Sequence, residues 1–214
     1  MHIDIRAAAA PVAPVRVPAA APRLPEKRIH CYKCHNEHVV SHFAKTTLCP
    51  SCGAFIELGN LTITANASRP VDIRGHLEVR GGANLNNSWI VCRSAEIEGS
   101  LTGTLLCEEG LVLSGSGRLS FRAYAGDVLV AASVRVEMGF PLVTAFLEVR
   151  GALEGPVLCS GPVRVRKGGE LAGEVRARSV IVDKGGSFCG RTHISPKLGR
   201  IPPFPDPHGL TSSF

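Results

Sequence analysis

Two stretches near the carboxyl end of the chain, VRVRKGGELAG at residues 163–173 and VIVDKGGSFCG at residues 180–190, match each other at an offset of 17 residues. Both valines, the Lys-Gly-Gly turn and the final glycine coincide. In residues 163–166 apolar and charged side chains alternate, as in a β-strand with one buried face. The glycine pair is typical of a tight turn. The match therefore predicts a short strand and a turn that recur along the chain.

A second match extends the repeat toward the amino terminus. EIEGSLTGTLLC at 96–107 corresponds to EVRGALEGPVLC at 148–159, an offset of 52 residues, which is close to three units of 17. Short strands and turns at one period predict a β-solenoid, in which each coil is one rung and equivalent positions stack. Residues 59–195 would then hold about eight rungs. An antiparallel sandwich is the alternative, but it does not bring the same turn back at the same phase.

Four cysteines precede this body in two Cys-x-x-Cys pairs: Cys31, Cys34, Cys49 and Cys52. This spacing can deliver four thiolates to one tetrahedral ion, and Pro50 and Gly53 favour the tight turn that such a site needs. We predict a structural zinc ribbon, since closed sulfur coordination suits zinc. Alternatives are a rubredoxin-like iron site, two disulfides, a thioredoxin-like dithiol and, for CYKCH, haem attachment. Haem attachment would leave the second cysteine pair unexplained.

The remaining histidines and cysteines of interest have simpler interpretations. His35, His38 and His42 lie beside the cysteine pairs. One of them replacing a thiolate is the alternative, but with four cysteines at the proper spacing we expect them to be solvated loop residues. The four isolated cysteines of the body are expected to point inward as small apolar side chains, with Cys107 and Cys159 at the same phase of the repeat. These four are Cys92, Cys107, Cys159 and Cys189.

The chain thus divides into four parts: an Ala/Pro tail at 1–28, a zinc-ribbon-like module at 29–58, the β-helix at 59–195 and a Pro-rich tail at 196–214. Both tails are expected to be disordered because they hold little apolar bulk. No segment approaches the roughly 20 apolar residues that span a bilayer, and the first residues lack the continuous apolar core of a signal peptide. We therefore expect a cytoplasmic protein.

The body resembles the bactofilins, the polymer-forming bacterial cytoskeletal proteins. The resemblance rests on recurring short Val/Ile strands, on the turns IEGSLTG and VRGALEG and on the closing VIVDKGGSFCG, and it covers about residues 70–195. It implies a right-handed β-helix that stacks end to end into filaments without nucleotide, with roles in scaffolding or cell shape, often near the membrane. The cysteine ribbon departs from the family's usual plan of a tail followed directly by the β-helix.

An uncapped solenoid end recruits another chain, so self-assembly through the ends is the expected mechanism. Phe188, Val180 and Val182 are the candidate residues of a polymer interface at the carboxyl end. The alternative for Phe188 is that it only plugs the end of the core. At the other end we expect the ribbon to sit on or beside the first rung, as a cap or as an adaptor for a protein partner or a membrane surface.

Two other function classes compete with the scaffold. A zinc-ribbon nucleic-acid-binding protein would fit the net charge of +6, but aromatic stacking residues are scarce. A β-helix acyltransferase would need a six-residue period and a positioned histidine, and only His76 and His193 are available in the coils. We therefore predict that the chain is not an enzyme, takes no small-molecule substrate and does not act mainly on nucleic acid.

Overall fold

The computed structural model describes residues 25–31, 34, 36–68 and 71–195. Within them the secondary structure consists of strands and turns without a helix, which confirms the all-β prediction. The two predicted tails fall largely on residues 1–24 and 196–214, which lie outside the described residues. The strands are β1 (Glu26–His30), β2 (Glu37–Ser41), β3 (Thr46–Leu48), β4 (Phe55–Glu57), β5 (Leu61–Ile63), β6 (Val71–Asp72), β7 (His76–Val79), β8 (Asn84–Cys92), β9 (Ser94–Ile97), β10 (Ser100–Leu113), β11 (Gly117–Val130), β12 (Arg135–Met138), β13 (Leu142–Val149), β14 (Ala152–Glu154), β15 (Val157–Cys159), β16 (Pro162–Val165), β17 (Glu170–Ala177), β18 (Ser179–Val182) and β19 (Ser187–Ile194).

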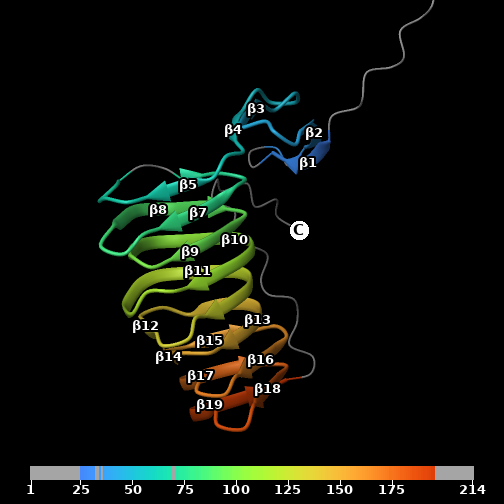
Figure 1. Cartoon of the computed structure of the whole chain (residues 1–214). Coiled ribbons are helices and arrows are strands. Elements are labelled where there is room, and N and C mark those ends of the chain that lie inside the picture. Colours follow the sequence, from blue (N-terminus) through green and yellow to red (C-terminus); the bar gives the residue numbers. More distant parts are fainter. Residues whose placement is uncertain (1–24, 32–33, 35, 69–70, 196–214) are drawn as a thin grey trace, which may run out of the picture.

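Strands β5 to β19 form one parallel sheet that winds into a solenoid of about eight coils (Figure 1). The coils can be counted along one face of the solenoid, here called face A. On this face each coil contributes one residue that stacks on its equivalent in the next coil, 16 to 19 residues further along the chain. The parallel pairing rules out the sandwich. The right-handed sense stays a prediction. The stacked residues are Leu61, Leu77, Ala95, Leu111, Val128, Leu147, Val163 and Val180.

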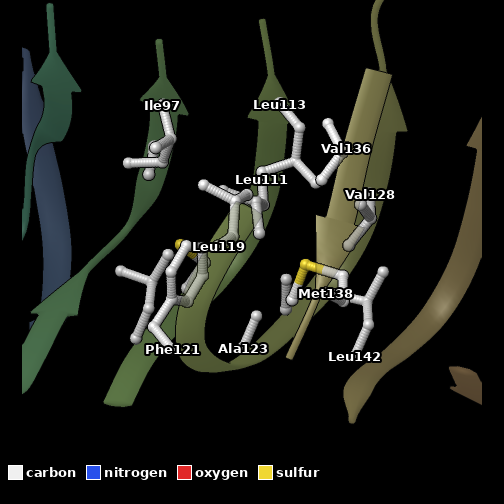
Figure 2. Close-up of a cluster of buried hydrophobic side chains, with 14 of the residues drawn as sticks. Ile97, Leu111, Leu113, Leu119, Phe121, Ala123, Val128, Val136, Met138 and Leu142 are labelled. Atoms are coloured by element: carbon white, nitrogen blue, oxygen red, sulfur yellow. The ribbon is translucent and has the colours of Figure 1, made fainter. Parts of the chain in front are cut away.

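The core lies along the axis of the solenoid. Alternate residues of each strand point inward, so that Ile97, Leu113 and Phe121 from neighbouring strands pack together with Met138 and Leu142 (Figure 2). Phe121 and Leu142 have no exposed surface. Burying a side chain of this size stabilises a fold by about 1.5–3 kcal/mol. One continuous core therefore joins all the coils.

The turns that follow face A explain why the repeat is weak in residues 118–146. In three coils the third residue after the last core position is a glycine with positive φ: Gly82 at 80°, Gly168 at 79° and Gly185 at 87°. In the weak coil the equivalent residue is Ser133, with φ of 66°. Strands β11 and β13 stack there in regular register at an offset of 19 residues. The coil is therefore present, but its turn cannot be recognised in the sequence because a serine stands where the other turns have glycine.

We expect Ser133→Gly to stabilise the protein by about 1 kcal/mol, because a left-handed conformation costs a residue with a Cβ roughly 1–2 kcal/mol and glycine almost nothing. Part of that gain is offset by the greater freedom of glycine in the unfolded chain. Thermal and urea unfolding measure the change. The neighbouring Ala132→Gly is the control, since Ala132 has no positive φ, and it should destabilise. Equal effects of both substitutions would contradict this account of the turn.

The amino-terminal module is built of two hairpins with a small core of its own. Strands β1 and β2 pair antiparallel, as do β3 and β4. Because β1 begins at Glu26, residues 26–28 belong to this module and not to the tail predicted at 1–28. Figure 1 places the module at the amino-terminal end of the solenoid, next to β5. Its core residues are Ile29, Cys31, Val40, Cys49, Ile56 and Leu58.

Candidate metal centre at the amino-terminal end

The four cysteines of the two predicted pairs come together in this module. The sulfur atoms of Cys31, Cys34, Cys49 and Cys52 all lie within 4.8 Å of one another. Cys31 and Cys52 approach to 3.6 Å, and Cys34 and Cys49 to 3.5 Å. Four thiolates around an ion at about 2.3 Å would be about 3.8 Å apart. The donor set therefore fits a tetrahedral, sulfur-coordinated metal ion.

Each cysteine pair sits where a strand ends and the chain turns back. Cys31 follows β1, and its N–H donates to the carbonyl of Asn36 at 3.0 Å. Cys49 follows β3, and its carbonyl accepts the N–H of Gly53 at 2.9 Å. The two turns lie next to each other. Cys31 and Cys49 are buried in the module core, whereas Cys34 and Cys52 are exposed. The hairpins thus hold the four sulfurs in place.

The thiols of the second turn differ sharply in acidity. Burial alone would raise the pKa of Cys49, but hydrogen bonds from the backbone of Cys52 and Ser51 and from the neighbouring thiols outweigh it and lower the pKa to about 6. For Cys52 the backbone of Ala54 lowers the pKa, yet burial and the other three thiols raise it to about 12. The Cys49 thiol therefore ionises easily, whereas the Cys52 thiol resists ionisation. A bound dication would favour the thiolate form of all four, as metal–sulfur sites require.

The module is joined to the solenoid by backbone hydrogen bonds. Glu57, the last residue of β4, forms a parallel bridge with Ile73, and its carbonyl accepts the N–H of Arg74 at 2.7 Å. The side-chain oxygen of Asn60 accepts the N–H of His76 at 2.9 Å. The end of β4 therefore continues one face of the solenoid beyond the first coil, and the module is attached to the amino-terminal end there.

Arg74 is a residue of this junction that sequence reasoning missed. Its side chain is 9% exposed and forms an ion pair with Glu108. Burial lowers the pKa of Arg74, while the negative charges of Asp72 and Cys31 act in the opposite direction. Its Nε is buried without a hydrogen-bond partner among the described residues. No spacing pattern marks a single arginine, so only the structure reveals a cation close to the cysteine cluster.

We expect Arg74→Leu to weaken metal binding by the cluster about 10-fold, since the partners that surround a metal site typically contribute 10- to 100-fold in affinity. The reason is that a tetrathiolate site with a dication keeps two negative charges, which a nearby guanidinium compensates. Competition with a chromophoric chelator measures the affinity. Arg80→Leu, at a side chain 58% exposed, is the control. Equal affinities of the two variants would contradict the role of Arg74.

The predictions for the other histidines and cysteines succeed only in part. His42 is exposed, but His38 lies in β2 with both ring nitrogens buried and without a partner among the described residues, so the expectation of a solvated loop was wrong there. His35 lies outside the described residues. Cys92, Cys107 and Cys159 are buried in the core as expected.

Cys189 corrects the prediction for the fourth body cysteine, because it is exposed. It follows Phe188, which packs against the core, and strand alternation therefore turns it outward. Its register partner in the preceding coil is Ala172, whereas Phe188 stacks on the buried Leu171.

The three candidate interface residues all lie on the last coil. Val180 stacks on Val163, Val182 on Val165 and Phe188 on Leu171. Each continues an inward-facing column of the core, but no described coil follows, so Val182 is 44% exposed. Ile181 and Ile194 add further exposed apolar surface. Within residues 71–195, therefore, no strand covers the section through the core at the carboxyl end of the solenoid.

The two coil histidines lie far apart in the fold. His76 is in β7, with Nδ1 2.8 Å from the hydroxyl of Ser94, and His193 is in the last strand, β19. Within the described residues, no helix is long and apolar enough to cross a membrane. Comparison with family models, with curated proteins and with solved structures returned no match.

Proposed function

We propose that this chain is a scaffold protein that assembles end to end through the carboxyl-terminal coil, without nucleotide, in the manner of the bactofilins that it resembles. Its principal partner is a second copy of itself. The amino-terminal module holds structural zinc and serves as a cap or adaptor, with a protein or a membrane surface as its partner. The chain acts in the cytoplasm, and self-assembly, rather than catalysis, is its activity.

The difference between the two ends is the observation that carries this proposal. The first coil carries the cysteine module, which is joined to it by the bridge between Glu57 and Ile73. The last coil leaves the columns of Val180, Val182 and Phe188 without a cover from the described residues. Exposed strand edges and core sections are the surfaces that recruit another copy. Two like ends that meet form a closed contact with twofold symmetry, so the carboxyl ends alone join two chains. A longer rod forms when the amino-terminal ends also pair with each other.

Zinc is the metal that best suits the cluster. Four cysteine sulfurs with no open position are typical of structural sites, and zinc needs neither redox chemistry nor a distorted geometry. Elemental analysis of protein purified without added metal tests the assignment. One zinc per chain supports it, and one iron with the visible absorption of a ferric thiolate centre would replace it with a rubredoxin-like site.

A single charge at the carboxyl end tests the assembly. Val182→Glu places a carboxylate where two core sections would meet, and an unpaired charge that loses its water on association costs several kcal/mol. We expect the variant to sediment more slowly than the unchanged chain at equal concentration, because its assemblies contain fewer copies. Its circular dichroism should be the same, which would show that the fold is intact.

Phe140→Glu is the matched control for this test. Phe140 is 40% exposed, close to the value for Val182, and lies between β12 and β13, away from both ends. The guanidinium of Arg122, 5.6 Å from the Phe140 ring, can pair with the new carboxylate. This control should assemble like the unchanged chain. If Val182→Glu also assembles normally, the joint does not lie at the carboxyl end.

A further inference from the structure

The exposed apolar side chains of the protein gather at its two ends. Among the described residues, eight large apolar side chains are exposed, and only Phe140 lies between the ends. The others are Val39, Phe43, Leu48 and Phe55 in the amino-terminal module and Ile181, Val182 and Ile194 in the last coil. Single exposed apolar residues are ordinary on a protein surface, but a concentration of them marks a site of association. The module end therefore has the surface of an interface, as the carboxyl end does.

The four exposed residues of the module occupy outward positions. Each directly precedes a residue that lies in the module core or packs against it. These inward neighbours are Val40, Ala44, Cys49 and Ile56. Because successive side chains of an extended chain point to opposite sides, the residue before each of them turns away from the core. The apolar surface of the module is thus additional to its core and contributes nothing to it.

Leu48 and Phe55 form one continuous patch on the outer face of the β3–β4 hairpin, here called the hairpin patch. They are register partners, and they are 63% and 59% exposed. Side chains of directly opposite residues on antiparallel strands are in contact distance of each other. Ile56, the next residue of β4, is 1% exposed in the module core. Among the described strands β3 pairs with β4 alone, so its second edge also has no strand partner.

The charge of the module favours a second copy over an anionic surface as the occupant of this patch. Binding to anionic lipid or nucleic acid depends on an excess of clustered Lys and Arg. Over residues 26–58 the two signs nearly balance: Lys27, Arg28, Lys33 and Lys45 against Glu26, Glu37 and Glu57. An identical apolar patch needs no opposite charge, and two such patches pair about a twofold axis.

We propose that the hairpin patch is the amino-terminal joint of the assembly, in which two modules pack Leu48 and Phe55 against each other about a twofold axis. This inference rests on the proposed function, in which the carboxyl-terminal coils join in pairs. It supplies the second contact that a rod of more than two chains requires. The module is then an adaptor whose partner is the same module of another copy. Coil-to-coil and module-to-module joints alternate along the rod.

One substitution at each end tests this joint through the number of chains in the assembly. Phe55→Glu places a carboxylate in the hairpin patch, where loss of its water on association opposes pairing. This variant should form particles of two chains, joined through their coils. Val182→Glu should also form particles of two chains, joined through their modules, and the double variant should be a single chain. Sedimentation velocity and light scattering measure the number, and Phe140→Glu should assemble like the unchanged chain.

Leu48→Glu repeats the test from the opposite strand of the hairpin and should also form particles of two chains. Hydrogen exchange of β3 and β4 shows whether each variant keeps the fold of the module. Protection equal to that of the unchanged chain is expected, because both side chains point away from the module core.

The possible outcomes separate this joint from the proposed function. Long rods of a folded Phe55→Glu or Leu48→Glu variant would overturn the joint and leave the scaffold proposal intact. Two-chain particles that persist in Val182→Glu and that Phe55→Glu separates would support the joint, even if the coils do not pair. Single chains of the unchanged protein under all conditions would contradict both. Flotation with lipid vesicles that depends on Phe55, together with unchanged rods, would assign the patch to a lipid surface and overturn the joint.

Discussion

Removal of the metal from the cysteine cluster is expected to unfold the amino-terminal module while the solenoid stays folded. The module has a core of only six residues, two of which are the metal-binding candidates Cys31 and Cys49. Structural zinc supplies about 10–16 kcal/mol of binding free energy to such small modules, more than a core of this size can replace. We therefore expect that Cys49→Ser, or chelation, abolishes the fold of residues 26–58.

Hydrogen exchange followed by mass spectrometry measures this effect by segment. Protection should be lost in β1 to β4 and weakened at Arg74, whose N–H donates to the carbonyl of Glu57, while β10 to β17 keep theirs. Ile73 should also stay protected, because its N–H donates to the carbonyl of Val91 in the solenoid. Cys189→Ser is the control, because this exposed thiol lies on the last strand. A module that stays protected after loss of the metal would show that its apolar core suffices and that the cluster is not structural.

A methyl group at Gly173 is expected to open the carboxyl-terminal coils. Gly173 has φ of +122°, and a Cβ there would lie 2.4 Å from the carbonyl oxygen of Gly155 in the preceding coil. Gly190 of the next coil repeats the contact, with a Cβ 2.0 Å from the carbonyl of Gly173. Backbone strain and a clash with rigid backbone together should make Gly173→Ala cost about 3 kcal/mol or more in unfolding free energy.

Gly168→Ala separates the clash from the strain. Gly168 also has positive φ, +79°, but a Cβ there would meet no atom within 4 Å. This control should cost only the roughly 1–2 kcal/mol of a left-handed residue. Urea unfolding gives both free energies, and limited proteolysis shows whether cleavage begins near β17. Equal costs would mean that the coils shift apart easily and that the close stacking of Gly155, Gly173 and Gly190 does not set their spacing.

The solenoid could be predicted because its signal is repeated. The Lys-Gly-Gly turns at 168 and 185 and the alternating valines give the same register that the structure shows between β16 and β18. The weak stretch could not be placed, because Ser133 takes the left-handed conformation without the glycine that would mark it. The exposure of Cys189 was missed for a related reason. The position of a residue within its coil decides whether its side chain points into the core or outward, and a shift of one residue reverses the direction.

The cysteine cluster could be predicted from spacing, but its surroundings could not. Two Cys-x-x-Cys pairs fix which sulfurs meet, and the structure brings these four together. The bridge from Glu57 to Ile73 and the burial of Arg74 depend on how two modules pack, which no local pattern encodes. The outward side of β10 was hidden in the same way, because Leu105, Leu106 and Cys107 look alike in the sequence and only Leu106 lies outside the core cluster.

Electron microscopy of the purified full chain without nucleotide tests self-assembly most directly. An eight-coil solenoid is about 40 Å long at roughly 4.8 Å per coil. We predict rods that exceed the length of one chain, with joints at which two carboxyl-terminal coils meet and which Val182→Glu abolishes. Single particles of one chain's length under all concentrations and salt conditions would contradict the scaffold proposal.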